Sequence, residues 1–265
     1  MCGLAGIVAL HPRAMAPERD ALARMASVLS HRGPDEYGLY RDDHAGLAHA
    51  RLSIVDLQTG QQPMADGSEN LWIVFNGEIF NYVELRAELI TLGHQFRTHS
   101  DTEVILHAWR AWGEAAFERM NGQWAVALWD SAVRRLVLAR DPMGICPLHL
   151  CEHGHYLYFG SEVKAIFAAN SSIPRALDPV GMDQTLTFWS IVPPQSVFQG
   201  VTELEPGHVR VYENGTVHDR AFAPAVSKFQ GSLEDAVVAV REALDHATEL
   251  RILRADVPVG SYLSG

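Results

Sequence analysis

The chain has 265 residues, of which 48% are hydrophobic and 20% are charged, and its formal net charge is −11. Such a composition is typical of a globular protein with an ordinary core, and its acidic balance argues against a nucleic acid or an anionic membrane as the main partner. No apolar run approaches the roughly 20 residues that span a bilayer, and the N-terminus lacks the basic region of a signal peptide.

Strands and amphipathic helices are both indicated in the first 113 residues. The apolar run at 4–10 predicts a buried strand, and Leu22, Met25 and Leu29 recur at helical spacing in the segment that follows. The loop "HRGPDEYG" separates this helix from the next strand. We expect strands over 4–10, 46–54 and 71–75, and helices over 16–30, 81–93 (Asn81 as cap, Gly93 as stop) and 100–113 (Ser100 or Asp101 at its start).

The middle of the chain is rich in short strands. They are expected over 123–130, 135–141, 147–151, 156–161 and 208–212. Asn214-Gly215 directly after the last of them predicts a two-residue hairpin turn. Short strands joined by tight turns favour antiparallel pairing, so we expect an α+β layered sandwich rather than a doubly wound parallel sheet.

Residues 231–265 differ from the part before them. The segment 231–255 predicts a long amphipathic helix, and "ADVPVGSYLSG" after it predicts a strand that runs into a Ser-Gly loop. Such a turn normally leads into a helix whose N-terminus holds phosphate. We therefore expect one domain over 2–220 and the beginning of a second over 231–265.

Cys2 places a thiol next to the end of the chain. If Met1 is removed, the α-amine of Cys2, with a pKa of about 7.7–8.0, lies beside its own thiol and can act as a general base near neutral pH. A nucleophile of this kind needs no separate histidine. The alternative is that Cys2 is simply a small apolar residue.

The segment "HARLSIVDL" places Arg51 among apolar residues. A buried arginine requires an anionic partner, and its planar fork suits a carboxylate. A bound carboxylate and a structural ion pair, for example with Asp56, are equally compatible with the sequence.

The segment "IVFNGEIFNY" predicts a tight turn at Asn76, Gly77 and Glu78. A hairpin turn is one interpretation of this pattern. The other is an oxyanion hole, formed by the Asn76 amide and the Gly77 N–H, beside a Glu78 carboxylate that accepts from an ammonium group.

Asp101 lies at the expected start of a helix, where helix capping is one interpretation. A second acid near Glu78 would alternatively complete an ammonium site. One thiol, one arginine, an oxyanion pair and two acids together fit an α-amino acid that carries a side-chain amide.

The cysteines are too sparse for a disulfide framework. Cys2, Cys146 and Cys151 form an odd set, which favours a reducing, cytoplasmic location. In "CPLHLCEH", a strand would point Cys146 away from Cys151 and its neighbouring histidines, so we expect no metal site there.

In combination, several segments of the chain resemble the class II glutamine amidotransferase family, and among its members the glutamine-hydrolysing asparagine synthetases. They are "MCGLAGIVAL", "LSHRGPDEYG", "ARLSIVDLQTGQQPM", "FNGEIFNYVELRAEL", "SDTEVILHAW", "ARDPMGICPL" and "DVPVGSYLSG". The resemblance implies the N-terminal nucleophile fold, a four-layer αββα sandwich, and a glutaminase that needs no cofactor. It also implies that the start of an α/β ATP-pyrophosphatase domain follows. This C-terminal synthetase domain uses ATP and Mg to amidate aspartate, with ammonia arriving through a tunnel.

The same resemblance implies residue roles. Cys2 attacks the glutamine amide, Asn76 and Gly77 form the oxyanion hole, and Glu78 and Asp101 receive the α-ammonium group. The remaining substrate-binding residues are Arg51 for the carboxylate and Leu52, Ser53, Ile54 and Val55 for the pocket wall. Leu263 and Ser264 match positions that contact ATP.

Two departures from the family pattern matter. The second glycine and the Asp-Ser pair that follow "LSG" in the family are absent from this sequence, so we expect the chain alone to support only the glutaminase half-reaction. Cys146 stands where relatives often carry a basic residue, which affects the tunnel and the interface between domains.

Three alternatives stay open at this point. The acceptor could be a carboxylate other than aspartate, the enzyme could be a different N-terminal nucleophile amidohydrolase, or the chain could be a non-catalytic interaction module of the same fold. Assembly is equally open, a homodimer included.

Overall fold

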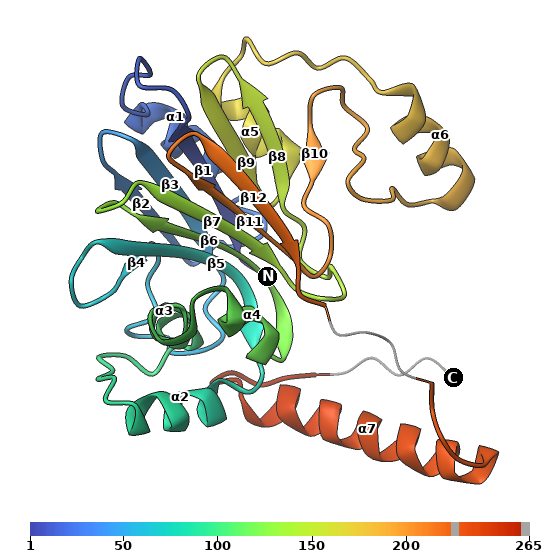
Figure 1. The fold of residues 1–265 in the computed structure, drawn as a ribbon. Helices are drawn as coiled ribbons and strands as arrows, with labels where there is room; N and C mark the ends of the chain where they lie inside the picture. The colour runs from blue at the N-terminus through green and yellow to red at the C-terminus, as the bar shows by residue number, and fades with distance from the viewer. Residues whose placement is uncertain (224–227, 261–265) are drawn as a thin grey trace.

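Two six-stranded antiparallel sheets form the centre of the protein in the computed structural model, which describes residues 1–223 and 228–260 (Figure 1). The first sheet has the strand order β10-β8-β9-β1-β3-β2 and the second has the order β12-β11-β7-β6-β5-β4. The strands are β1 (Gly3–Ala9), β2 (Glu36–Arg41), β3 (Ala45–Arg51), β4 (Met64–Ala65), β5 (Leu71–Ile79), β6 (Gly122–Asp130), β7 (Arg135–Arg140), β8 (His149–His153), β9 (Tyr156–Gly160), β10 (Thr202–Glu203), β11 (His208–Glu213) and β12 (Thr216–Ala221).

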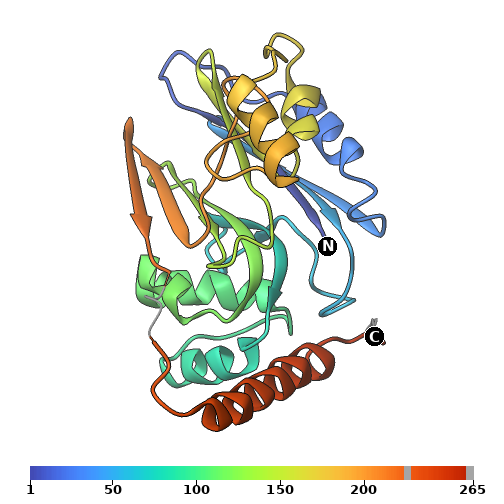
Figure 2. The same cartoon turned by 90° about the vertical axis from the view of Figure 1, so that its right-hand side faces the viewer.

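Helices cover the outer face of each sheet. The helices are α1 (Arg19–Val28), α2 (Tyr82–Thr91), α3 (Asp101–Trp112), α4 (Ala116–Arg119), α5 (Val163–Ala169), α6 (Pro179–Phe188) and α7 (Leu233–Leu253), with a 3-10 turn at Gly113–Ala115. Helices α1 and α5 pack on the first sheet, and α3 packs on the second (Figure 2). The order of layers is therefore helix, sheet, sheet, helix, as the family resemblance implies.

Side-chain alternation along the central strands builds three apolar layers. In β6, Trp124, Val126 and Leu128 point to the helices on the second sheet, whereas Ala125 and Trp129 point to the first sheet. The residues of β1 divide in the same way between the layer under α1 and the layer between the sheets. Strands that are buried on both faces read as continuous apolar runs, which is why the sequence marks them so clearly.

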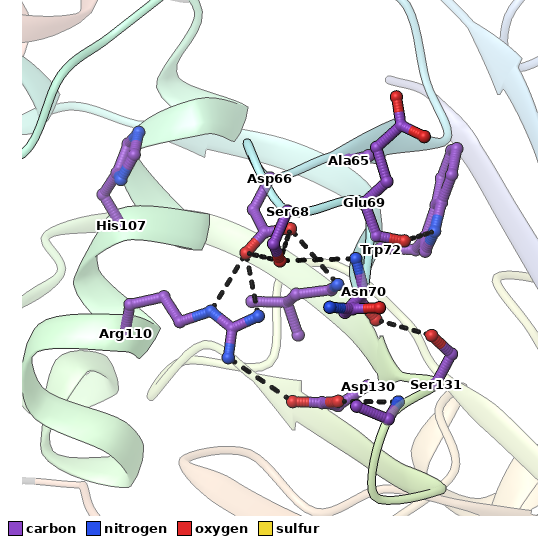
Figure 3. Close-up of polar contacts among 12 residues, drawn as sticks. Ala65, Asp66, Ser68, Glu69, Asn70, Trp72, His107, Arg110, Asp130 and Ser131 are labelled. Carbon is purple, nitrogen blue, oxygen red and sulfur yellow. Dashed lines mark hydrogen bonds and ion pairs between the residues drawn. The ribbon is translucent and has the colours of Figure 1, made fainter.

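A polar network fixes the loop between β4 and β5 to helix α3 (Figure 3). The guanidinium of Arg110 donates to Asp66 at 2.8 and 3.0 Å and lies 3.5 Å from Asp130. Burial alone would raise the pKa of Asp66, but hydrogen bonds from Arg110 and Ser68 lower it below its usual value. This carboxylate is therefore ionised and stabilising in the folded chain at neutral pH.

Several predicted elements differ from those observed. The strand expected over 46–54 ends at Arg51, and the strand expected over 71–75 continues to Ile79, so Asn76, Gly77 and Glu78 lie within β5 and form no tight turn. Residues 255–260 are irregular where a strand was expected, and the Ser-Gly loop lies outside the described residues.

Helix α7 forms as expected, with a capping box between Ser232 and Asp235. It runs alongside α2 in both views (Figures 1 and 2). Its apolar side chains remain exposed, including Leu233, Val240 and Leu244, which are 82%, 59% and 63% accessible. Within residues 1–223 and 228–260, no helix combines the length and apolarity required to cross a membrane.

Candidate active site

One pocket opens at the end of the layer between the two sheets. It is lined by Met1, Cys2, Arg51, Leu52, Ile54, Val55, Gly60, Gln62, Phe75, Gly77, Glu78, Ser100, Asp101, Thr102 and Gln123. Strand alternation explains why residues so distant in sequence meet there. Cys2 shares a face with Leu4 of β1, and Glu78 shares a face with Val74 of β5, and both faces look into the layer between the sheets.

The terminus that carries Cys2 is held in place on three sides. Gly3 pairs with Ala50 in the ladder between β1 and β3. Arg32 Nε donates to the Cys2 carbonyl at 2.9 Å, and the Leu52 N–H donates to Cys2 Sγ at 3.3 Å. These contacts order the end of the chain, so a thiol at position 2 has a defined geometry.

Burial raises the pKa of the Cys2 thiol above its ordinary value of 9.0, even though the Leu52 N–H, the N-terminal ammonium and Arg51 each lower it. The thiol is therefore protonated at neutral pH. A nucleophilic role consequently requires a base close to Sγ that removes its proton as it attacks.

Arg51 is almost fully buried, with 4% of its surface accessible, at the end of β3. Its Nη1 donates to Glu36 at 2.8 Å, and its Nη2 donates to the carbonyls of Asp56 at 2.6 Å and Val55 at 3.3 Å. The structural ion pair suggested with Asp56 is thus made by Glu36 instead. Three of the five guanidinium N–H groups have these partners, and two remain for a ligand.

Asn76 is completely buried in β5, opposite Ala125 of β6. Neither its Nδ2 nor its Oδ1 has a hydrogen-bond partner among the described residues. A buried polar group without a partner carries a free-energy cost of about 1–3 kcal/mol, and a bound oxygen atom that accepts from Nδ2 would offset the part due to that nitrogen.

Gly77 explains why β5 can bend at this point without forming a turn. Its φ is +148°, and a Cβ placed on it would lie 2.0 Å from the Gln123 carbonyl oxygen. The Asn-Gly pair at 76–77 therefore lies within a strand, where the backbone of Gln123 approaches Gly77 closely. The pair at Asn214 and Gly215, where φ is +51° and +76°, forms a true hairpin turn.

Two acids lie on the far side of the pocket. Asp101 accepts from the Ile79 N–H at 3.1 Å, and burial together with the charge of Glu78 raises its pKa from 3.8 to about 7. Burial likewise raises the pKa of Glu78, opposed by the N-terminal ammonium and Arg251. The cap of α3 is Ser100, which accepts from the Thr102 N–H, so the Asp101 carboxylate is not the helix cap.

Other predicted residues lie elsewhere. Ser53 and Asn76 do not line the pocket, and the Ser53 N–H donates to Asp35 at 2.8 Å. Leu263 and Ser264 lie outside the described residues. Cys146 packs between the sheets and Cys151 packs under the helices, and the described chain contains no cluster of three metal-ligating side chains.

Gln62 and Gln123 also line the pocket, although the sequence did not indicate them. Gln62 accepts from the Phe75 N–H at 2.6 Å and donates to Thr102 at 3.3 Å, which ties β5 to α3 behind the pocket. Gln123 of β6 lines the pocket opposite Glu78. Gln62 lies within the segment "ARLSIVDLQTGQQPM" and Gln123 lies in none of the segments quoted above, but the place of both at the pocket follows only from long-range contacts.

Comparison with known proteins gives a consistent result. Residues 1–223 match the model of the glutamine amidotransferase domain family. The chain is 37% identical to asparagine synthetase (glutamine-hydrolyzing) 1 of Bacillus subtilis and 33% identical to a probable asparagine synthetase of Dictyostelium discoideum, in each case over 100% of this chain. It spans 42% and 43% of the length of these relatives.

Solved structures support the fold. The chain superimposes on glutamine phosphoribosylpyrophosphate amidotransferase from Bacillus subtilis with a TM-score of 0.60 at 18% identity, over 85% of this chain and 50% of the other. It superimposes on an allosteric regulatory enzyme of purine biosynthesis with a TM-score of 0.61 at 20% identity, over the same fractions. These two matches show the fold, and the match of residues 1–223 to the family model shows that the chain belongs to the glutamine amidotransferase domain family.

Proposed function

We propose that the pocket hydrolyses the side-chain amide of glutamine, with Cys2 as nucleophile. The observation that carries the proposal is the meeting of a thiol, a buried arginine, a buried acid (Asp101) and a half-buried acid (Glu78) in one pocket, from four separate segments of the chain. Glutamine carries the complementary carboxylate, ammonium and amide groups. Release of glutamate from glutamine by the purified chain is the direct test, and a chain that releases none would refute the proposal.

The proposed mechanism uses the chain's own amine. Once Met1 is removed, the α-amine of Cys2 takes the proton of Sγ as the sulfur attacks the amide carbon. The resulting oxyanion accepts hydrogen bonds from the Asn76 Nδ2 and the Gly77 N–H. The ammonium then returns the proton to the leaving nitrogen, ammonia departs, and a thioester forms. Water, activated by the same amine, releases glutamate and regenerates the thiol.

Asn76 does not line the pocket, and its proposed role in the oxyanion hole is supported by its buried amide, which has no partner among the described residues. The raised pKa of Cys2 supports the role of an internal base, because the thiol must lose its proton during the reaction. Arg51, through its two remaining N–H groups, is proposed to hold the α-carboxylate, with Leu52, Ser53, Ile54 and Val55 as the neighbouring wall. Glu78 and Asp101 are proposed to hold the α-ammonium group.

Replacement of Arg51 by alanine is expected to raise the KM for glutamine by at least about tenfold with a smaller effect on kcat. A charge-assisted hydrogen bond to the carboxylate is worth about 1.5–3 kcal/mol. Steady-state kinetics measures the effect. Arg110→Ala serves as the control because Arg110 lies in the network around Asp66, and an unchanged KM in Arg51→Ala would contradict the assignment.

The KM for glutamine is expected to rise as the pH falls through about 7, because protonation of Asp101 removes the charge that attracts the ammonium group. Asp101→Asn should abolish this pH dependence. A KM profile that is flat between pH 6 and 8 in the unchanged chain would contradict the role of Asp101.

The raised pKa of Asp101 also predicts that the stability of the fold depends on pH. The pKa of Asp101 is raised on folding, so between pH 4 and 7 the folded chain binds more protons than the unfolded chain and stability falls with rising pH. Asp101→Asn should therefore raise the melting temperature at pH 8 by about 2–4 °C or more. Asp66→Asn is the matched contrast. The pKa of Asp66 is lowered, so this variant should lower the melting temperature and leave the KM unchanged.

For the whole protein we propose an asparagine synthetase, because relatives with that name match the entire chain. In this proposal residues 2–220 form the glutaminase domain and 231–265 begin the synthetase domain. That domain uses ATP and Mg to activate aspartate for ammonia, and Leu263 and Ser264 contribute to ATP binding. The exposed apolar side chains of α7 support a further domain that covers them.

We also propose a cytoplasmic location, which the three free cysteines support. A different carboxylate acceptor is the alternative for the synthetase half. Amidation assays on a form of the protein that includes the proposed synthetase domain, with aspartate and other carboxylates in parallel, distinguish aspartate from another acceptor.

A further inference from the structure

The segment after α7 contacts the wall of the glutamine pocket. The Asp256 N–H donates to the Ile54 carbonyl at 3.0 Å, and the Asp256 carboxylate accepts from the Asp56 N–H at 2.7 Å. The two bonds clamp three consecutive residues of the loop that follows β3. Two further contacts hold the same end of α7 in place, an ion pair between Arg254 and Glu84 of α2 and the stacking of Arg251 over Phe80.

The clamped loop contributes directly to the pocket. Ile54 and Val55 line it, and the carbonyls of Val55 and Asp56 orient the guanidinium of Arg51. A shift of this loop would therefore move both the pocket wall and the group proposed to hold the substrate carboxylate.

Hydrogen bonds on both sides of Asp56 stabilise its conformation. Its φ is +52°, a left-handed conformation that aspartate adopts at single positions with the help of local hydrogen bonds. Its carboxylate accepts from the N–H groups of Thr59 and His99, which fixes the later part of the loop. The Asp256 carboxylate supplies the acceptor for the remaining Asp56 N–H.

We infer that Asp256 is a positioning residue for glutamine binding, an inference that rests on the proposed glutaminase function. It fixes the loop at 54–56 and, through the loop carbonyls, the side chain of Arg51. Asp256 also lies next to the segment that leads to Leu263 and Ser264. Coupling of this kind is reciprocal, so a displacement of residues 255–260 weakens glutamine binding, and bound glutamine holds these residues in place.

The test compares Asp256→Ala, Asp256→Asn and Asp245→Ala in the whole chain. Asp245 is exposed on α7, so its replacement is the matched control. Asp256→Ala is expected to raise the KM for glutamine about fivefold with kcat within twofold of the unchanged chain. Asp256→Asn keeps an acceptor oxygen and should recover most of this loss, and Asp245→Ala should have no effect. An unchanged KM in Asp256→Ala would overturn the inference.

Hydrogen exchange separates this inference from the proposed function. Amides of residues 52–60 should exchange faster in Asp256→Ala than in the unchanged chain or in Asp245→Ala. Equal exchange in all three would overturn the inference whatever the catalytic activity. Faster exchange in a chain that never releases glutamate would refute the proposed function and leave the contact intact.

Discussion

Replacement of Cys2 by alanine is expected to abolish glutamine hydrolysis and to leave the fold intact. Among the hydrogen bonds of the described chain, the Cys2 Sγ takes part only in those with the Leu52 carbonyl and N–H. The thiol therefore contributes little to the core. Its removal deletes the proposed nucleophile and leaves no group at that position that can form a thioester. Glutamate release and the melting temperature, measured on the same preparation, check both parts.

Cys151→Ala provides the control, because Cys151 lies under the helices of the first sheet and away from the pocket. This variant should retain glutaminase activity. Glutamate release by Cys2→Ala at the rate of the unchanged chain would show that the nucleophile lies elsewhere.

Asn76→Ala is expected to lower kcat by roughly 10²–10³, the usual effect of losing one oxyanion-hole donor, with little change in KM. The amide of Asn76 has no partner among the described residues, so its removal breaks no bond within the fold. Truncation should leave the melting temperature unchanged or slightly raised, because a buried unsatisfied amide is removed. Single-turnover kinetics isolates the chemical step.

Asn76→Asp tests the donor itself. The side chain keeps its shape but exchanges N–H donors for an oxygen near Glu78. It should be at least as inactive as the alanine variant. A kcat in Asn76→Ala within threefold of the unchanged chain would contradict the oxyanion-hole assignment.

The layers of the fold could be predicted from the sequence because double-sided burial leaves a local trace. The strands that became β1, β6 and β7 are continuous apolar runs, and the hairpin at Asn214 and Gly215 is marked by its turn residues. Helix α6 and strand β2 were not predicted, and strand β12 was indicated only by the hairpin turn before it. Their side chains are largely exposed or only half-buried, so no apolar period identifies them.

The error at Asn76 and Gly77 has a physical cause. An Asn-Gly pair indicates a turn when the two flanking strands pair with each other, as β11 and β12 do around Asn214. At Gly77 the partner is β6, far along the chain, and the glycine is required by the approach of the Gln123 backbone. A local pattern cannot distinguish these two causes.

The residues of the candidate site likewise differ in whether local sequence or long-range contacts determine their place. Cys2, Arg51, Glu78 and Asp101 have chemistry that draws attention in isolation, and the structure brings them to one pocket. The partners Glu36 and Gln62 and the clamp at Asp256 depend on long-range pairing. These three residues lie within segments that resemble the family, but nothing in their local sequence indicates which partner each of them contacts.

The central claim is that the freed α-amine of Cys2 is the catalytic base, and one paired measurement tests it most directly. Intact mass and the rate of glutamate release are determined on two samples, one with Cys2 at the N-terminus and one that retains Met1 behind a short blocking extension. The account predicts hydrolysis in the first sample and a loss of at least about 100-fold in the second, because an acylated amine cannot accept the proton. A sample whose mass includes Met1 and which hydrolyses glutamine at the full rate would contradict it.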